Sequence, residues 1–335
     1  MRKIKVGSDF SGVGAFDQAL LRLGIDYKTV FACDMDKYAR TTFIHNYGEP
    51  KYYPVNVYDR EIPEESLDIY MTSPPCQAFS LAGKRLGKED KRGILFFNSH
   101  EFIAKNKPRF FIFENVKGLL SDDNGNTFQE WVNMLGGKSV NGLPILFPYE
   151  DSVPYHIYWK VLNAKEHGVP QNRERVFIIG IRDDQDNNFR FPAEEHLTKR
   201  LKDILEEDVD DKYYLNDKTL SLLQSISNNC IKVKSATSSG YEIASEGDSI
   251  NFSFPNSKTR KGRVGKQVAQ TLDTQCNQAV YIDCIRRLTP RECFRLMGFP
   301  DSFGFSCVSD SQAYKQAGNS IVVRVLEKII KNLPL

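Results

Sequence analysis

The chain has 335 residues, of which 41% are hydrophobic and 26% are charged, and its formal net charge is +2. This composition is too apolar for a disordered chain, and a net charge so close to zero gives no argument for a polyanionic partner. The sequence has no run of 18 apolar residues and no apolar leader, so we expect neither membrane insertion nor secretion. Its seven cysteines include no Cys-x-x-Cys pair. We therefore expect no disulfide framework, no metal site and a cytoplasmic location.

Residues 3–182 alternate short β-rich segments with segments of helical periodicity. The expected strands lie at residues 4–6, 29–33, 67–72, 109–113 and 176–181. The expected helices lie at 16–23, where Gly24 would end the helix, at 36–46 and at 94–105. This alternation predicts an α/β fold with a doubly wound, mostly parallel sheet. Residues 131–154 are rich in glycine and proline and are expected to form a surface insertion without chemistry.

The composition changes between about residues 185 and 285, where Asp, Asn, Ser, Lys and Gly dominate. We expect a smaller and irregular second domain there. Residues 256–266 carry five basic side chains and no acidic one, which fits either a nucleic-acid contact or a solvated loop. A last helix is expected over 320–333, packed back on the first sheet.

A glycine turn follows the first expected strand, at residues 9–15, and leads into a helix. This geometry lets a ligand approach the backbone and a helix N-terminus. The third glycine of the dinucleotide fingerprint is missing, so a nucleoside without phosphates fits better than NAD. The second strand ends at Asp34 and Met35, which could contact a ribose and an adenine ring. Asp34 could instead only cap the next helix.

The run Ser73-Pro74-Pro75-Cys76-Gln77 follows a third apolar strand. The two prolines restrict the backbone and put the Cys76 thiol in a rigid loop at the carboxyl end of that strand, where α/β enzymes carry their chemistry. The alternative is that Cys76 is a buried apolar thiol.

Six motifs in order resemble those of the DNA (cytosine-5)-methyltransferases along nearly the whole chain. They are Phe10-Ser11-Gly12-Val13-Gly14, the Pro-Pro-Cys-Gln turn from Ser73 to Ser80, Glu114-Asn115-Val116, Gln171-Asn172-Arg173-Glu174-Arg175, the run from Arg286 to Glu292, and the run from Gln312 to Ser320. The sequence departs from the family pattern at Ser8, at Asn56-Val57 and at Pro74, none of which replaces the thiol.

The resemblance implies a Rossmann-like methyltransferase fold that uses S-adenosylmethionine and releases S-adenosylhomocysteine. It also implies a discontinuous catalytic domain, residues 1–184 plus 305–335, and a target-recognition domain, residues 185–304. The implied cofactor contacts are Phe10, Gly12, Val13, Gly14, Asp34, Met35, Asn56, Val57, Pro74, Leu95, Asn319 and Ser320.

The implied reaction methylates carbon-5 of a cytosine that is rotated out of the DNA duplex. The Cys76 thiolate would add to carbon-6, a protonated Glu114 would donate to ring nitrogen-3, and Arg173 would hold the carbonyl oxygen, with Arg175 beside it. Residues 83–93 are expected to close over DNA as a mobile loop. The expected DNA contacts are Gln77, Ser80, Lys84, Arg85, Lys258, Arg260, Lys261, Arg263, Thr271 and Leu272.

The expected partner is double-stranded DNA, bound by a monomer, with a separate restriction endonuclease as a candidate companion. Two alternatives stay open: a tRNA cytosine-5 methyltransferase, and a non-catalytic DNA-binding protein of the same fold. A dehydrogenase is disfavoured by the glycine spacing.

Overall fold

The structure is a computed structural model that describes residues 2–75, 94–215, 223–227, 230–253, 257–282 and 284–335. The chain divides into two compact units. Unit 1 comprises Met1–Leu162, Glu174–Ala193 and Leu326–Leu335, and unit 2 comprises Asn163–Arg173 and Glu194–Val325. The bounds of the catalytic and target-recognition domains remain a prediction, because compactness does not test which segments bind DNA.

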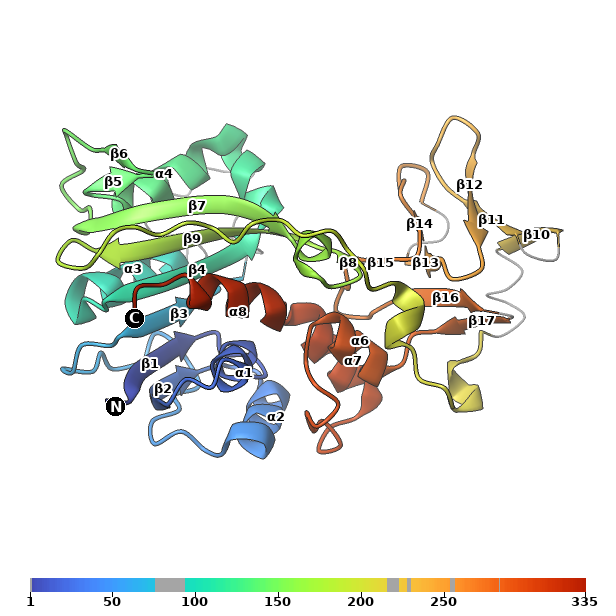
Figure 1. Cartoon of the computed structure of the whole chain (residues 1–335), viewed down its shortest axis with the longest axis horizontal. Coiled ribbons are helices and arrows are strands. Elements are labelled where there is room, and N and C mark those ends of the chain that lie inside the picture. The colour runs from blue at the N-terminus through green and yellow to red at the C-terminus, as the bar shows by residue number, and fades with distance from the viewer. Residues whose placement is uncertain (1, 76–93, 216–222, 228–229, 254–256, 283) are drawn as a thin grey trace. The chain divides into compact units, whose positions relative to one another are not determined.

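Unit 1 is built on an eight-stranded sheet with the order β2-β1-β3-β4-β9-β7-β5-β6 (Figure 1). Its strands are β1 (Ile4–Asp9), β2 (Tyr27–Cys33), β3 (Ile69–Thr72), β4 (Phe110–Val116), β5 (Ser139–Val140), β6 (Leu143–Pro144), β7 (Tyr155–Asn163) and β9 (Glu174–Arg182). The strands from β2 to β4 are parallel to one another, and β9 runs antiparallel to β4. The predicted α/β class with a mostly parallel sheet is confirmed.

Helices cover both faces of this sheet. They are α1 (Ala15–Arg22), α2 (Lys37–Tyr47), α3 (Ile94–Asn106), α4 (Asn126–Leu135) and α8 (Val323–Lys331). In Figure 1, α3 and α4 lie behind the strands and α8 lies in front of them. Arg22 Nε of α1 lies 2.6 Å from Glu327 Oε1 of α8, so these two helices share a face. The fold is therefore doubly wound, as predicted.

The core on the α3–α4 face is aromatic. Phe113 of β4, Phe96 of α3 and Trp131 of α4 are 1–2% exposed, and the Phe96 and Trp131 rings stack with centroids 4.3 Å apart. Trp131 was predicted to begin a surface insertion, and this is wrong because α4 continues to Leu135 with a buried apolar face. The hairpin of β5 and β6 follows, and the exposure of Leu146 (80%) and Phe147 (90%) confirms that the insertion itself lies on the surface.

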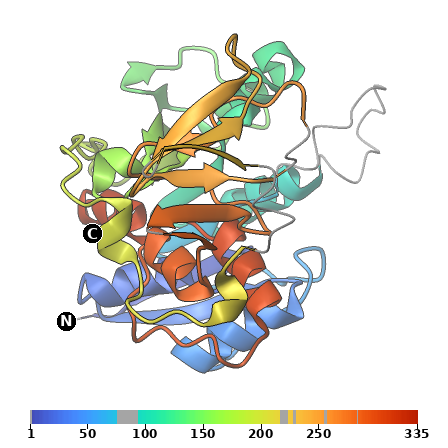
Figure 2. The ribbon, with the colours of Figure 1, turned by 90° about the vertical axis from the view of Figure 1, so that its right-hand side faces the viewer.

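Unit 2 contains short strands in small sheets (Figure 2). Two sheets have the orders β10-β11-β12 and β14-β13-β16-β17, and β15 pairs with β8. The strands are β8 (Gln171–Asn172), β10 (Leu223–Ser227), β11 (Cys230–Lys234), β12 (Tyr241–Ser245), β13 (Ser249–Asn251), β14 (Val264–Gly265), β15 (Ala269–Gln270), β16 (Gln278–Ile282) and β17 (Cys284–Arg287), and the helices are α6 (Pro290–Leu296) and α7 (Asp310–Asn319). These short strands fit the irregular character expected from the sequence.

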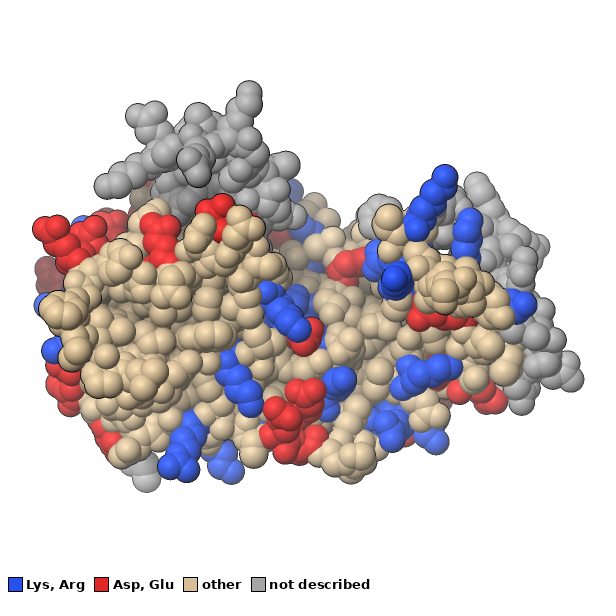
Figure 3. Space-filling view, turned by 90° about the horizontal axis from the view of Figure 1, so that it is seen from above, with Lys and Arg blue, Asp and Glu red and all other residues tan. Residues whose placement is uncertain are grey.

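Charged side chains of both signs are interspersed over the face shown in Figure 3, in keeping with the small net charge. Within the described part of the chain, no helix combines the length and the apolar character needed to cross a membrane.

Candidate functional site

The carboxyl ends of β1, β2 and β3 lie side by side at one edge of the sheet in unit 1, and we call this region the strand-end site. β1 lies between β2 and β3, and its last residue, Asp9, is in register with Cys33 of β2 and Thr72 of β3. The strand order reverses direction at β1, since β2 lies on one side of it and β3, the next strand along the chain, lies on the other. Open parallel sheets bind their ligands at such a switch point, and the nucleoside contacts expected from the sequence follow these strand ends.

The turn after β1 has the backbone that a close ligand approach requires. Phe10, Gly12 and Gly14 have φ values of 57°, 54° and 85°. A Cβ at Gly14 would lie 2.2 Å from the Tyr47 ring, so glycine is needed there for α1 to pack against α2. A Cβ at Gly12 would meet nothing within 4 Å, so the space beside Gly12 is open to a ligand.

Asp34 is bonded to this turn. Its Oδ2 accepts from the Gly12 N–H at 2.8 Å and its Oδ1 accepts from the Asp36 N–H at 2.8 Å. Burial raises the pKa of Asp34, and the two N–H groups act against that shift. The cap of α2 is Asp36, whose Oδ1 accepts from Tyr38 N and Ala39 N. Asp34 is therefore not the helix cap, which removes the alternative left open by the sequence.

Arg40 and Tyr53, which the sequence analysis did not single out, join residues 53–57 to the strand-end site. The Arg40 guanidinium donates to the carbonyls of Asp34 (3.4 Å), Pro54 (3.0 Å) and Tyr53 (2.8 Å). The Tyr53 hydroxyl lies 3.3 Å from Ser11 Oγ. These contacts bring the segment of Asn56 and Val57 to the same part of unit 1 as the glycine turn.

Apolar side chains are exposed around these contacts. Met35 is 82% exposed, Val55 56% and Tyr58 50%, whereas Val57 is buried. Exposed large apolar groups next to polar groups are typical of ligand sites. Val13 and Pro74 are buried, Phe10 and Leu95 are half-buried, and Asn56 is exposed, with its Oδ1 accepting from Tyr58 N at 3.1 Å.

Cys76 lies outside the described residues, as do Gln77, Ser80, Lys84, Arg85 and the whole of the predicted loop 83–93. The described chain shows what holds the turn before the thiol. Asn115 Nδ2 donates to the Pro74 carbonyl at 3.1 Å, and Asn115 Oδ1 accepts from Val116 N at 2.9 Å. The end of β4 therefore fixes the backbone two residues before Cys76.

Glu114 and Arg175 form a pair in unit 1. Arg175 Nε on β9 lies 3.1 Å from Glu114 Oε1 on β4, and their side chains are 17% and 10% exposed. The antiparallel pairing of β4 and β9 brings them together, because Val116 is in register with Arg175. A carboxyl and a guanidinium in contact at a strand end can bind adjacent acceptor and donor atoms of one polar ring.

Arg173 donates to main-chain carbonyls of unit 2. Its guanidinium donates to the carbonyls of Leu272 (3.1 Å), Gly318 (3.0 Å) and Ser320 (2.8 Å), and the residue is 3% exposed. Through Arg173, these bonds join the run from Gln312 to Ser320 to Leu272. The motif led us to expect that Arg173 holds the carbonyl oxygen of the cytosine. Its hydrogen bonds to three main-chain carbonyls favour a structural role for this side chain.

The remaining expected contacts also belong to unit 2. Asn319, at the end of α7, is exposed, and Ser320 is 8% exposed. Lys258, Lys261 and Thr271 are exposed and Arg260 is half-buried.

Two of the expected DNA contacts are buried. Arg263 and Leu272 are each 1% exposed. Arg263 Nη1 donates to the Ser253 carbonyl at 3.1 Å, and Leu272 N donates to Gln171 Oε1 at 3.1 Å. Both lie in the interior of unit 2, which favours a structural role for their side chains.

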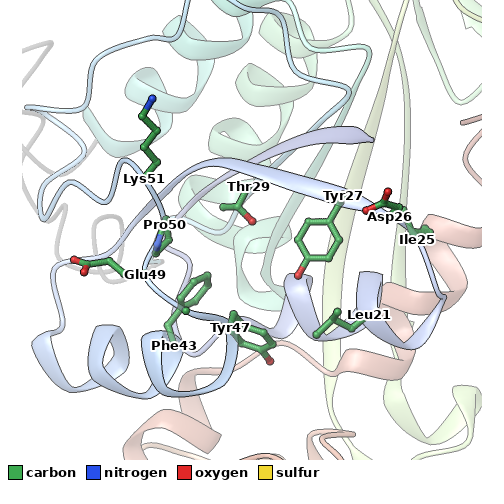
Figure 4. A pocket seen from close by; sticks show the side chains of 11 residues that line it. Leu21, Ile25, Asp26, Tyr27, Thr29, Phe43, Tyr47, Glu49, Pro50 and Lys51 are labelled. Carbon is green, nitrogen blue, oxygen red and sulfur yellow. The ribbon is translucent and has the colours of Figure 1, made fainter. Parts of the chain in front are cut away.

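A separate cavity of about 420 Å³ lies in unit 1 between the end of α1, the start of β2 and the end of α2 (Figure 4). Its wall includes Leu21, Tyr27, Thr29, Phe43 and Tyr47. None of the expected cofactor contacts lines it. Among the described residues, no group of three His, Cys, Asp or Glu side chains could hold a metal ion.

The sequence profile of the C-5 cytosine-specific DNA methylases matches residues 4–334. The chain is 34% identical to the type II methyltransferase M.HhaI of Haemophilus parahaemolyticus over 97% of this chain and 92% of that protein. It is 35% identical to the type II methyltransferase M.HpaII of Haemophilus parainfluenzae over 97% of this chain and 87% of that protein. It is also 33% identical to the orphan methyltransferase M.SPRI of Bacillus phage SPR over 99% and 98%.

Solved structures share the fold. The DNMT2 protein of Spodoptera frugiperda superimposes with a TM-score of 0.65 at 21% identity, over 98% of this chain and 99% of that chain. A putative DNA modification methyltransferase encoded within an Escherichia coli prophage gives a TM-score of 0.65 at 21% identity, over 98% of both chains.

Proposed function

This chain belongs to the family of C-5 cytosine-specific DNA methylases, and from that premise we propose how its own residues methylate carbon-5 of cytosine in DNA. The family uses S-adenosylmethionine and a covalent adduct between enzyme and base. The observation that carries the proposal is the Glu114–Arg175 pair at 3.1 Å, on the strand whose Asn115 holds the turn before Cys76.

The residues of the strand-end site suit S-adenosylmethionine. Gly12 leaves open space beside a left-handed turn, and the Asp34 carboxylate next to it can accept from ribose hydroxyls. Met35, Asn56 and Val57 are the adenine contacts, with Phe10, Val13, Gly14, Pro74 and Leu95 around them. Asn319 and Ser320 are further cofactor contacts. The bound cofactor supplies an electrophilic methyl group on sulfur. No step requires a metal ion.

Cys76 is the nucleophile. Its thiolate adds to carbon-6 of cytosine, which forms a carbon–sulfur bond and pushes an electron pair toward carbon-5, where the methyl group is accepted. Loss of the proton from carbon-5 then returns the electron pair, breaks the bond to sulfur and restores the aromatic ring. Asn115 positions this nucleophile through the Pro74 carbonyl.

Glu114 and Arg175 bind the edge of the cytosine. Glu114 hydrogen-bonds ring nitrogen-3, where charge develops as the thiolate adds, and Arg175 donates to the carbonyl oxygen. We assign the carbonyl to Arg175 because it contacts Glu114, whereas Arg173 donates to three main-chain carbonyls of unit 2.

The substrate is a cytosine rotated out of duplex DNA, at a cost of a few kcal/mol. Lys258, Arg260, Lys261 and Thr271 are its described contacts, and Gln77, Ser80, Lys84 and Arg85 are further ones. The enzyme acts as a monomer in the cytoplasm, with a separate restriction endonuclease as its companion.

The test is methyl transfer from labelled S-adenosylmethionine to duplex DNA and, separately, to tRNA. Label is expected in DNA, at cytosine carbon-5, with loss of turnover in a Cys76→Ser variant. Duplex DNA that contains 5-fluorocytosine should capture the natural chain covalently, because fluorine at carbon-5 blocks the final proton loss. Label in tRNA alone would contradict the choice of substrate, and a fully active Cys76→Ser variant would contradict the mechanism.

A further inference from the structure

A buried ion pair lies directly beneath the glycine turn of unit 1. Arg60 Nε and Nη2 donate to Asp9 Oδ1 at 3.1 Å and Oδ2 at 3.0 Å, so the pair is bidentate. The two side chains are 3% and 0% exposed. The Tyr70 hydroxyl also donates to Asp9 Oδ2 at 2.6 Å, and Tyr70 is fully buried.

The surroundings of this cluster leave little freedom to the guanidinium. Arg60 lies over the Phe102 ring of α3, 4.5 Å from its centroid, and the Tyr70 and Phe102 rings stack at 4.2 Å. Burial raises the pKa of Asp9, and Arg60 and the Tyr70 hydroxyl act against that shift. Two hydrogen bonds in a planar fork fix both the distance and the angle between the partners, which a single bond cannot do.

The cluster joins the segments that carry the proposed cofactor contacts. Asp9 ends β1 and directly precedes Phe10, whose φ of 57° is unusual for a side chain of its size. Arg60 follows Asn56 and Val57 by a few residues, and Tyr70 lies on β3, which leads to Pro74. Arg40 holds the other end of the 53–60 segment through the carbonyls of Tyr53 and Pro54.

We infer that Arg60 is a positioning residue for S-adenosylmethionine: through Asp9 it fixes the segment of Asn56 and Val57 relative to the turn of Phe10 and Gly12. This inference rests on the proposed function, since these residues are contacts only if the chain binds that cofactor. A purely structural pair would affect the stability of unit 1 without changing the affinity of the folded protein. A positioning pair changes the affinity as well.

The experiment measures the dissociation constant of S-adenosylhomocysteine by calorimetry on the full chain, well below the Tm of each variant. Arg60→Met is expected to weaken binding about tenfold, with kcat at saturating methyl donor within about threefold of the natural value. Arg60→Lys, which keeps the charge but loses the fork, is expected to weaken binding by a smaller factor. Asp9→Asn gives an independent variant of nearly unchanged volume if Arg60→Met does not fold.

A matched control is the buried pair of Arg286 and Glu292 in unit 2. Its guanidinium makes two bonds to the carboxylate at 2.9 Å and 2.6 Å, and its side chains are 4% and 0% exposed. Arg286→Met is expected to lower the Tm as much as Arg60→Met, because each leaves a buried carboxylate unpaired, while the affinity for S-adenosylhomocysteine stays within about twofold.

The double variant Asp9→Leu/Arg60→Met separates two effects of losing Arg60: the loss of the bond that positions the segments, and the burial of an unpaired Asp9 carboxylate. It leaves no unpaired charge, so its Tm is expected to exceed that of Arg60→Met. An affinity for S-adenosylhomocysteine within twofold of the natural value in Arg60→Met and Asp9→Asn, with a lowered Tm, would overturn the inference. Failure of the natural chain to bind S-adenosylhomocysteine would instead refute the proposed function, and the inference with it.

Discussion

At the scale of single residues, Arg173 and Arg175 have different roles although they are two positions apart. Arg175 contacts Glu114, whereas Arg173 donates to three carbonyls in unit 2. We expect Arg175→Lys to lower kcat about 10²-fold with little change in Tm, because a lysine cannot reproduce the planar donors. Arg173→Lys should mainly lower the Tm. Steady-state kinetics and thermal unfolding of both variants check this, and the reverse pattern would contradict the assignment.

Asp17 on α1 makes the free energy of unfolding depend on pH. It is 2% exposed, its Oδ1 accepts from Thr29 Oγ1 at 3.3 Å, and burial raises its pKa to about 7. The folded state therefore holds a proton that the unfolded chain releases near pH 4, so stability falls as the pH rises from about 4 to 7, by at most about 1.4 kcal/mol per pH unit.

The variant Asp17→Asn should remove this dependence, since an amide does not ionise. We expect the Tm of Asp17→Asn relative to the natural chain to rise between about pH 4 and pH 7 and to stay nearly constant above that. Thermal unfolding across this range measures it. A difference in Tm that is independent of pH would show that Asp17 is ionised throughout.

At the scale of elements, the end of β4 holds the turn before the nucleophile. Asn115→Ala removes the 3.1 Å bond to the Pro74 carbonyl without touching the Glu114–Arg175 pair. We expect kcat to fall by up to about 10²-fold, since small displacements of a reacting group have effects of that size, while the affinity for S-adenosylhomocysteine is retained. An unchanged kcat would show that the turn is held by its prolines alone.

Side chains on the surface hairpin contribute less to the free energy of unfolding than side chains in the core. The hairpin comprises β5, β6 and the residues that follow. Phe147 is 90% exposed and Phe113 of β4 is 1% exposed. Phe147→Ser should change the free energy of unfolding by less than about 0.5 kcal/mol, whereas Phe113→Ala should lower it by about 3–5 kcal/mol. Denaturant unfolding of the two variants tests this, and a large loss in Phe147→Ser would contradict the exposed position.

At the scale of the whole molecule, the net charge of +2 is too small to attract DNA by itself. Binding therefore depends on individual basic side chains. Lys258 and Lys261 are exposed, and each is expected to neutralise one phosphate. Lys258→Ala and Lys261→Ala should each weaken binding to all duplex sequences and reduce the slope of log affinity against log salt by about 1. Arg263→Ala, at a buried position, should lower the Tm instead. Salt titrations measured by fluorescence anisotropy distinguish these outcomes.

Local pattern was sufficient for β1 to β4, β9 and the helices α1 to α3 of unit 1, but it predicted neither β7 nor α4. Apolar alternation and helical periodicity predicted the strands of the parallel sheet and the helices between them, and Gly24, with φ 66°, ends α1 as expected. The insertion was predicted to begin too early, because glycines and prolines after residue 135 hid the apolar face of α4.

The partners of each side chain were decided by tertiary structure. The motif alone does not distinguish Arg173 from Arg175, since the register of β4 with β9 determines which guanidinium meets Glu114. No local pattern indicates that Asp9, Arg60 and Tyr70 form one buried cluster, because Arg60 and Tyr70 lie 51 and 61 residues after Asp9. The amino-acid order thus determined the fold class and the reaction through periodicity and motif, which are local. Pairing over long separations depends on how the sheet folds, and only the folded chain reveals it.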